Sequence, residues 1–186
     1  MGVPFSVQPA DIDESVRSDE QPMGYARRMA VGKATHVASQ LSPGHHVLGV
    51  DTIVVLDQLI LGKPVDREDG LRMLSLLADS THQVITALCL ASGELVQELQ
   101  SVSEVTFAPI DDTTRECYWD TGEGADKAGC YAIQGYGATF VSHIRGSHSG
   151  IMGLPIYETE QLLKQAGIHT WIHRSTAAES DCHTQK

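Results

Sequence analysis

The chain has 186 residues, of which 41% are apolar and 20% charged, and a formal net charge of −11 at pH 7. This length is enough for one domain with a substantial core, or for two small lobes that share a cleft. The negative charge repels nucleic acid and anionic membrane surfaces, and an aromatic content of 5% gives no obvious stacking platform for bases. Because the sequence shows neither an apolar run of membrane-spanning length nor a secretory signal, we expect a cytoplasmic protein without membrane or nucleic-acid partners. An anionic small molecule is compatible with this charge where a few lysines and a divalent metal converge.

The cysteines and histidines do not form an obvious metal site. Cys89, Cys117, Cys130 and Cys182 are far apart and make no C-x-x-C pair, which fits unpaired thiols in a reducing compartment. Two histidines, at positions 169 and 173, have i,i+4 spacing near the tail, but no third ligand accompanies them. A solvated helix end is the better interpretation.

In chain order, the first predicted element is a short strand at residues 3–7, followed by an acidic stretch and a helix from Pro22. The helix has a buried stripe of small and apolar residues, and Lys33 falls on that stripe. Two interpretations of Lys33 are open: it extends from the edge of the core into solvent, or it points into a cleft. The stripe consists of Ala26, Met29, Ala30, Ala34 and Val37.

The middle of the chain predicts a hairpin and a helix. Residues 47–56 form an apolar run that continues on both sides of Asp51, and residues 53–56 and 59–61 make hairpin arms around Asp57 and Gln58. Asp66, with Asp69 three residues later, is typical of an N-cap, and the helix that follows buries leucines 71, 74 and 77.

The second half of the chain alternates strands and helices. Strands are expected at residues 83–91, 102–107 and 138–144, and helices at 113–120 and 155–166, with a glycine-rich stretch at 129–137. This order predicts an α/β fold with a mixed twisted sheet and flanking helices. We expect one domain over residues 1–168 and a polar C-terminal tail over 169–186.

Asp51 is the most informative candidate for chemistry. A carboxylate among many aliphatic neighbours costs several kcal/mol unless it is paired, bound to a metal or at the exposed end of a strand. An aspartate that makes local turn hydrogen bonds is the commoner case. A strand is predicted on both sides of Asp51, however, so a functional carboxylate is the stronger hypothesis.

Three lysines and a glutamine complete the candidate set. Lys33, Lys63 in a Gly-Lys-Pro break and Lys127 beside Gly129 are what a phosphate site needs in an acidic protein, although a loop lysine is usually only solvated. Gln134 lies in the glycine-rich stretch, where its amide could contact a base edge. From the residues alone, the sequence predicts an acidic α/β protein with a candidate metal–phosphate site.

These same residues carry a resemblance to the Maf family. The chain resembles the family in its G-A-D-T…G-K-P block, its T-H-x-V-x-T strand, its D-K-A-G-A-Y-G-I-Q-G segment and the G-L-P before its last helix. The matching residues are 48–54 with 62–64, 81–86, 126–135 and 153–155, joined by 11–14 and 33–34. The segment that ends in I-Q-G is similar to the corresponding segment of the family branch that acts on dTTP and UTP.

The resemblance implies a pyrophosphatase in which two lobes surround a central cleft, with a fold like that of inosine triphosphatases. It implies that Asp51 accepts a proton, that Asp51 and Glu14 bind Mg²⁺ or Mn²⁺, and that Glu14, Lys33 and Lys63 hold the metal and the phosphates. Substrate binding falls to Thr52, Gln134, Asp126 and Lys127, of which Thr52 and Gln134 select the base. The family also implies a role in nucleotide pools, with a link to septum formation.

One family element is not found in this sequence. Family members carry a strand and an S-x-S-x-R-R loop shortly before the segment matched by residues 2–5. We therefore expect either a start upstream of Met1 or a truncated member that is weakly active and prone to form a homodimer. Two alternatives follow: a catalytically impaired nucleotide-binding regulator, and a purine-specific triphosphatase of the inosine-triphosphate type, which should lack I-Q-G.

Overall fold

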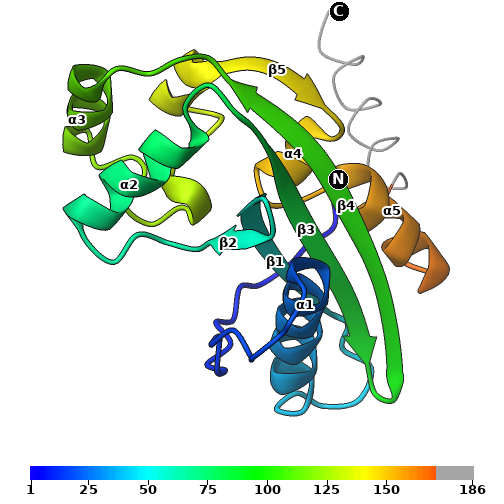
Figure 1. Ribbon diagram of the computed structural model, residues 1–186. Helices are drawn as coiled ribbons and strands as arrows, with labels where there is room; N and C mark the ends of the chain where they lie inside the picture. Colours follow the sequence, from blue (N-terminus) through cyan, green and yellow to red (C-terminus); the bar gives the residue numbers. More distant parts are fainter. Residues whose placement is uncertain (171–186) are drawn as a thin grey trace, which may run out of the picture.

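The computed structural model describes residues 1–170 and has one five-stranded sheet as its centre (Figure 1). The strands lie in the order β2-β1-β3-β4-β5, and all four neighbouring pairs are antiparallel. Their bounds are β1 Val47–Leu56, β2 Leu59–Leu61, β3 Thr81–Ser92, β4 Leu95–Phe107 and β5 Val141–Arg145. The prediction of an α/β protein is confirmed, but the prediction of a mixed sheet is wrong. Tight hairpins join β1 to β2 and β3 to β4, and such hairpins impose antiparallel pairing.

The predicted strand at residues 3–7 is also wrong. Residues 1–21 contain no helix or strand, and Phe5 and Val7 are 85% and 82% exposed. Met1 and Val3 instead pack beside Leu88 and Leu90. An alternating pattern of side chains is not sufficient for a strand, because the backbone of a strand must also form hydrogen bonds with the edge of another strand.

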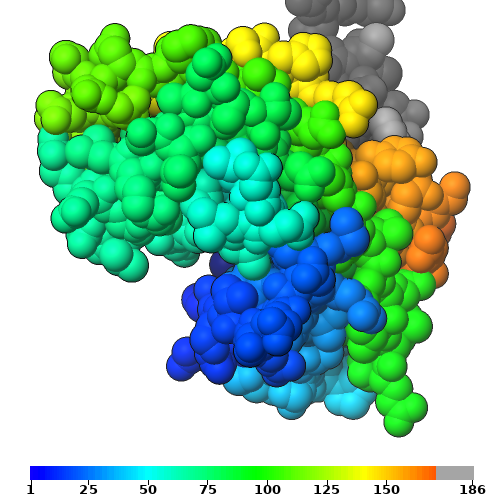
Figure 2. All heavy atoms as spheres, viewed as in Figure 1, coloured from blue at the N-terminus to red at the C-terminus, as the bar shows by residue number. Residues whose placement is uncertain are grey.

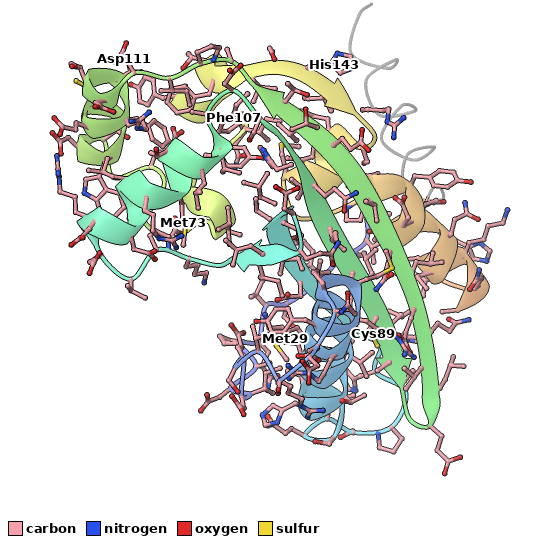
Figure 3. The ribbon with its side chains drawn as sticks, viewed as in Figure 1. Met29, Met73, Cys89, Phe107, Asp111 and His143 are labelled. Atoms are coloured by element: carbon pink, nitrogen blue, oxygen red, sulfur yellow. The ribbon has the colours of Figure 1, made fainter. Side chains whose placement is uncertain are left out.

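One face of the sheet is covered by α1, Pro22–Ala38. Ala26, Ala30 and Ala34 are fully buried against the alternate residues of β1 and β3 that face the helix. At Gly49 a Cβ atom would lie 2.4 Å from the carbonyl oxygen of Ala30, so the helix approaches β1 more closely than any side chain permits. Figure 3 shows Met29 and Cys89 in this region.

The opposite face is covered by α5, Ile156–Gln165, whose Leu162 and Leu163 contact Leu88 and Leu90. Predicted to begin at Pro155, this helix begins one residue later. A short helix that the sequence did not predict, α4 (His148–Ile151), precedes it, with Ser147 as N-cap.

A second packing region lies at the end of the sheet where Phe107 is buried (Figure 3). It includes α2, Arg67–Leu77, and α3, Asp112–Asp120. Asp66 caps α2 as predicted, by accepting a hydrogen bond from the Asp69 amide, whereas α3 is capped by Asp111. The predicted strand at 138–144 begins only at Val141, because Tyr136–Phe140 form a 3₁₀ turn.

No helix within residues 1–170 is both long enough and apolar enough to cross a membrane. The predicted tail and the histidine at position 173 lie largely or wholly outside the described residues.

Candidate active site

The candidate site is built where one edge of β1 is left open. Strand β2 pairs only with the last three residues of β1, Val54 to Leu56, so the edge beside Asp51 and Thr52 has no strand partner there. Successive residues of a strand point to opposite faces. Asp51 therefore lies on the α1 face and Thr52 on the other, yet both reach the same cleft around the open edge.

The cleft has a volume of about 400 Å³ and is lined by residues from widely separated parts of the chain. Figure 2 shows the surface indented between the α2–β2 region and the region of α1 with residues 1–21. All eight residues proposed from the sequence line this one cleft: Glu14, Lys33, Asp51, Thr52, Lys63, Asp126, Lys127 and Gln134. Their shared location confirms that the sequence motifs meet in space, and their individual roles stay predictions.

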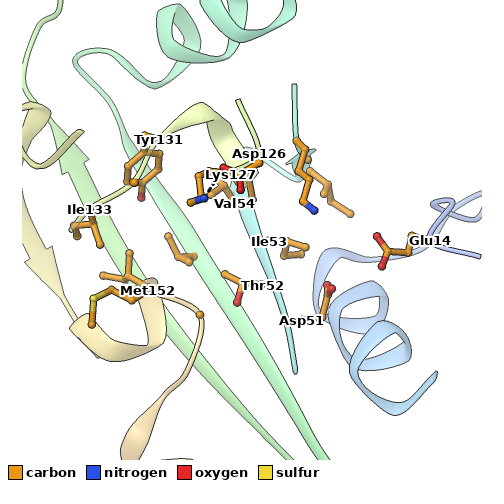
Figure 4. Close-up of a pocket in the computed structure, with 18 of the residues that line it drawn as sticks. Glu14, Asp51, Thr52, Ile53, Val54, Asp126, Lys127, Tyr131, Ile133 and Met152 are labelled. Carbon is orange, nitrogen blue, oxygen red and sulfur yellow. Dashed lines mark hydrogen bonds and ion pairs between the residues drawn. The ribbon is translucent and has the colours of Figure 1, made fainter. Parts of the chain in front are cut away.

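The cleft has a carboxylate-rich side and an apolar wall, with the charged Asp126 and Lys127 between them in this view (Figure 4). Glu14 and Asp51 lie together beside α1, whereas Tyr131, Ile133 and Met152 lie on the opposite side, with Asp51's neighbour Thr52 between the two groups. The Glu14 and Asp51 carboxylates accept an anionic group only with cations beside them, of which Lys33 is one, whereas the opposite side suits a flat, weakly polar group.

Lys33 joins the two carboxylates on the charged side. Its Nζ lies 2.7 Å from Oδ1 of Asp51 and 2.9 Å from Oε1 of Glu14, so of the two sequence interpretations the one that points Lys33 into the cleft is confirmed. Burial raises the pKa of Asp51 above its usual value, and the Lys33 ammonium opposes that rise only in part. Burial by itself would lower the pKa of Lys33, but its bonds to Asp51 and Glu14 outweigh this and raise it. A buried carboxylate with a raised pKa beside a fixed cation is an arrangement often found at catalytic sites.

The other two lysines are placed by loops that touch each other. The backbone N–H of Gly129 donates to the carbonyl of Gly62 at 3.0 Å, which ties the loop of Lys63 to that of Lys127. At Gly129 the backbone has a φ of +68°, and a Cβ atom would lie 3.0 Å from Val54, so glycine suits this close approach. Lys127 also forms an ion pair with Asp126.

Two residues that sequence reasoning missed hold the loop of Gln134. The carboxylate of Glu123 accepts from the backbone N–H groups of Tyr136 and Gly137 at 2.8 and 2.9 Å, and from the hydroxyl of Tyr118 at 3.0 Å. That hydroxyl in turn accepts the N–H of Ala132 at 3.1 Å. No local pattern could have revealed this clamp, because its partners lie up to 14 residues apart and meet only in the folded chain.

Asp51 and Glu14 are chemically suited to a divalent metal. Both are hard oxygen donors on the same side of the cleft, where each now binds the Lys33 ammonium. Mg²⁺ commonly takes one or two protein carboxylates together with substrate phosphates. Within residues 1–170 no group of three or more His, Cys, Asp or Glu side chains could hold a metal by itself. The donor set therefore fits a metal that arrives with an anionic ligand.

The fold and the cleft define the class: an α/β protein whose cleft joins three lysines and three carboxylates to an apolar wall. Comparison with known proteins gives the family. A family model described as Maf-like protein matches residues 1–166, and the chain belongs to this family, as the motifs predicted.

Several relatives carry the name dTTP/UTP pyrophosphatase. The one from Pseudoalteromonas atlantica is 43% identical over 171 residues, which cover 90% of this chain and 89% of the relative. The one from Hahella chejuensis is 44% identical over 92% of this chain and 86% of its own. The relative from Alcanivorax borkumensis is 45% identical over 92% and 89%.

Proposed function

We propose that this chain is a nucleoside triphosphate pyrophosphatase that hydrolyses dTTP and UTP to the monophosphate and pyrophosphate. The observation that carries the proposal is the polarity of the cleft, with the Asp51–Lys33 pair at its charged side and Thr52 next to an apolar wall. The names of its relatives support the choice of substrate. The catalytic unit spans residues 1–168, and the expected location is the cytoplasm.

In the proposed reaction, a water oxygen attacks the α-phosphorus of the bound nucleotide. The bond from this phosphorus to the oxygen that bridges it to the β-phosphorus breaks, and pyrophosphate leaves with that oxygen. Asp51 accepts the proton of the attacking water, which requires its ionised form. Lys33 fixes the Asp51 carboxylate, while Lys63 and Lys127 offset the negative charge of the phosphates.

A divalent metal, Mg²⁺ or Mn²⁺, would be held by Asp51 and Glu14. When bound with the substrate, such an ion neutralises phosphate charge and orients the triphosphate. Glu14 is half exposed, so its side chain can turn from Lys33 toward an incoming ligand.

At the other end of the ligand, Thr52 and Gln134 face the base. Asp126 instead acts at the phosphate end, where its ion pair holds Lys127. The apolar wall of Tyr131, Ile133 and Met152 suits the flat face of a pyrimidine.

The test is the substitution Asp51→Asn with pyrophosphate release from dTTP as readout. Asn is nearly isosteric but cannot accept the proton, so we expect turnover to fall by at least about a hundredfold with the fold intact. Asp57→Asn is the matched control, because Asp57 lies in the β1–β2 turn at a φ of +48°, a conformation that Asn tolerates. Unchanged turnover in Asp51→Asn would contradict the proposal. A wild-type chain that binds dTTP but releases no pyrophosphate would instead be the nucleotide-binding regulator.

A further inference from the structure

A chain of hydrogen bonds leads from the cleft into the protein through two threonines. Thr52 on β1 and Thr86 on β3 lie directly opposite each other, so their side chains share one face of the sheet. Their hydroxyl oxygens are 2.9 Å apart. The hydroxyl of Thr86, which is fully buried, also lies 2.8 Å from the carbonyl oxygen of Gly150 at α4.

Counting hydrogens fixes the direction of this chain. A hydroxyl has one hydrogen to donate, and a carbonyl oxygen can only accept. Thr86 must therefore donate to Gly150, so the bond between the threonines is one in which Thr52 donates and Thr86 accepts. With its hydrogen committed, the hydroxyl of Thr52 offers only lone pairs to the cleft.

The carbonyl at the end of the chain is held firmly. Gly150 accepts a second hydrogen bond from the N–H of Gly153 at 2.9 Å, and its own N–H donates to Ser147 Oγ at 3.0 Å. Ser147 is in turn bound to β4, because its N–H donates to Ser103 Oγ at 2.9 Å. The sheet and α4 thus set the orientation of the Thr86 hydroxyl independently of any ligand.

On the cleft side, Thr52 lies between the charged side and the apolar wall (Figure 4). Gly153 lies beside its hydroxyl, since a Cβ atom there would be in van der Waals contact with Thr52 Oγ1 at 3.6 Å. Gln134 is exposed, and its amide can offer either its oxygen or its NH₂ by rotation. Gln134 by itself therefore cannot tell a donor from an acceptor on the base, whereas Thr52 can.

We infer that Thr86 is a positioning residue that makes Thr52 an obligatory acceptor, and that this acceptor selects uracil and thymine against cytosine. The inference rests on the proposed function. Uracil and thymine carry an N–H at N3 between two carbonyls, whereas cytosine has a bare lone pair at N3. Thr52 can accept the N3–H of the first two, but two lone pairs face each other when cytosine is bound.

The experiment compares kcat/KM for UTP and CTP in the wild type, Thr86→Val and Thr86→Ser. Valine has the shape of threonine but frees the Thr52 hydrogen, which can then turn toward cytosine, so we expect the UTP/CTP ratio to fall by about tenfold. Serine keeps the hydroxyl and should retain the wild-type ratio. The matched control is Thr81→Val at the other end of β3, whose hydroxyl pairs across the sheet with Thr106 at 2.8 Å, outside the cleft.

A second measurement uses only the wild type and so does not depend on how a variant folds. A methyl group at N3 of UTP removes the donor, whereas one at C5 gives the thymine base. We expect 3-methyl-UTP to lose at least about tenfold in kcat/KM relative to 5-methyl-UTP.

The outcomes separate the inference from the proposed function. An unchanged UTP/CTP ratio in Thr86→Val, equal losses in the valine and serine variants, or equal rates on the two methylated nucleotides would each overturn the inference alone. A wild type that hydrolyses neither UTP nor dTTP would overturn both.

Discussion

His82 shows how one buried titratable side chain ties stability to pH. It is 2% exposed, its Nε2 lies 2.9 Å from the Tyr131 hydroxyl, and the rings of Phe107 and Tyr131 pack against it edge to face. In residues 1–170 its Nδ1 has no hydrogen-bond partner. Burial lowers the pKa of His82 from 6.5 to about 4. Between about pH 4 and pH 6.5, the folded protein therefore holds this imidazole neutral, whereas the unfolded chain would protonate it.

The sign of the effect on stability follows. A lowered pKa contributes stability that is fully present above pH 6.5 and is lost as pH falls from 6.5 toward 4. Between pH 7 and pH 5 we expect His82 to lower the free energy of unfolding by about 2 kcal/mol. Denaturant unfolding of the wild type and of His82→Gln at both pH values measures this. The carboxylates contribute alike to both proteins, so equal pH dependence in the two would contradict the prediction.

At the scale of elements, the contact between α1 and β1 sets the geometry of the Lys33–Asp51 ion pair. Gly49 allows the helix backbone to lie against the strand, and this places Lys33 beside Asp51 two residues further along β1. A side chain at position 49 would collide with the backbone of Ala30 and Ala34, at 2.4 and 2.6 Å, and backbone atoms cannot rotate away. The helix itself must then shift.

We therefore expect Gly49→Ala to destabilise the protein by about 1–3 kcal/mol and to lower turnover of dTTP by separating Lys33 from Asp51. Thermal unfolding and a pyrophosphate assay measure the two effects. Gly24→Ala in α1 is the control, because no atom lies within 4 Å of the added methyl group and alanine favours a helix. A Gly49→Ala protein as stable and active as Gly24→Ala would refute this account.

The loop that carries Gln134 depends on the Glu123 clamp rather than on a helix or strand. Removing the carboxylate in Glu123→Ala leaves the N–H groups of Tyr136 and Gly137 without their acceptor and frees the loop. We expect KM for dTTP to rise several-fold with a smaller change in kcat, since in the proposed function this loop contacts the base and does not carry the proton acceptor. Steady-state kinetics test this, with Glu116→Ala on the exposed side of α3 as control. An unchanged KM would show that the loop keeps its shape without the clamp.

At the scale of the whole molecule, local patterns predicted local structure well. The β1–β2 turn, the Asp66 cap and the buried stripe of α1 each depend on residues within a few positions of one another, and all three are present. The antiparallel pairing of β1 with β3 and of β4 with β5, and the absence of a partner for residues 3–7, depend on segments far apart in the chain. Periodicity carries no information about either, which is why those two predictions were wrong.

The candidate site likewise has residues that local patterns indicate and residues that they do not. Charge, strand context and family motifs indicated eight of the residues that line the cleft. They did not indicate Glu123 or Tyr118, nor the hydrogen bond by which Thr86 orients Thr52. Those roles depend on strand register and on hydrogen-bond direction, which a linear pattern does not encode.

The open edge of β1 has a consequence for how such a protein can change. Asp51 and Thr52 are consecutive, so the proposed proton acceptor and the proposed base-contacting hydroxyl are separated by one peptide unit, on opposite faces of one strand. Sliding the strand by one residue would exchange their faces, and each would then meet the wrong end of the nucleotide. If these roles hold, insertion or deletion of a single residue in this part of β1 should disrupt both of them, whereas a substitution at position 52 should change base preference alone.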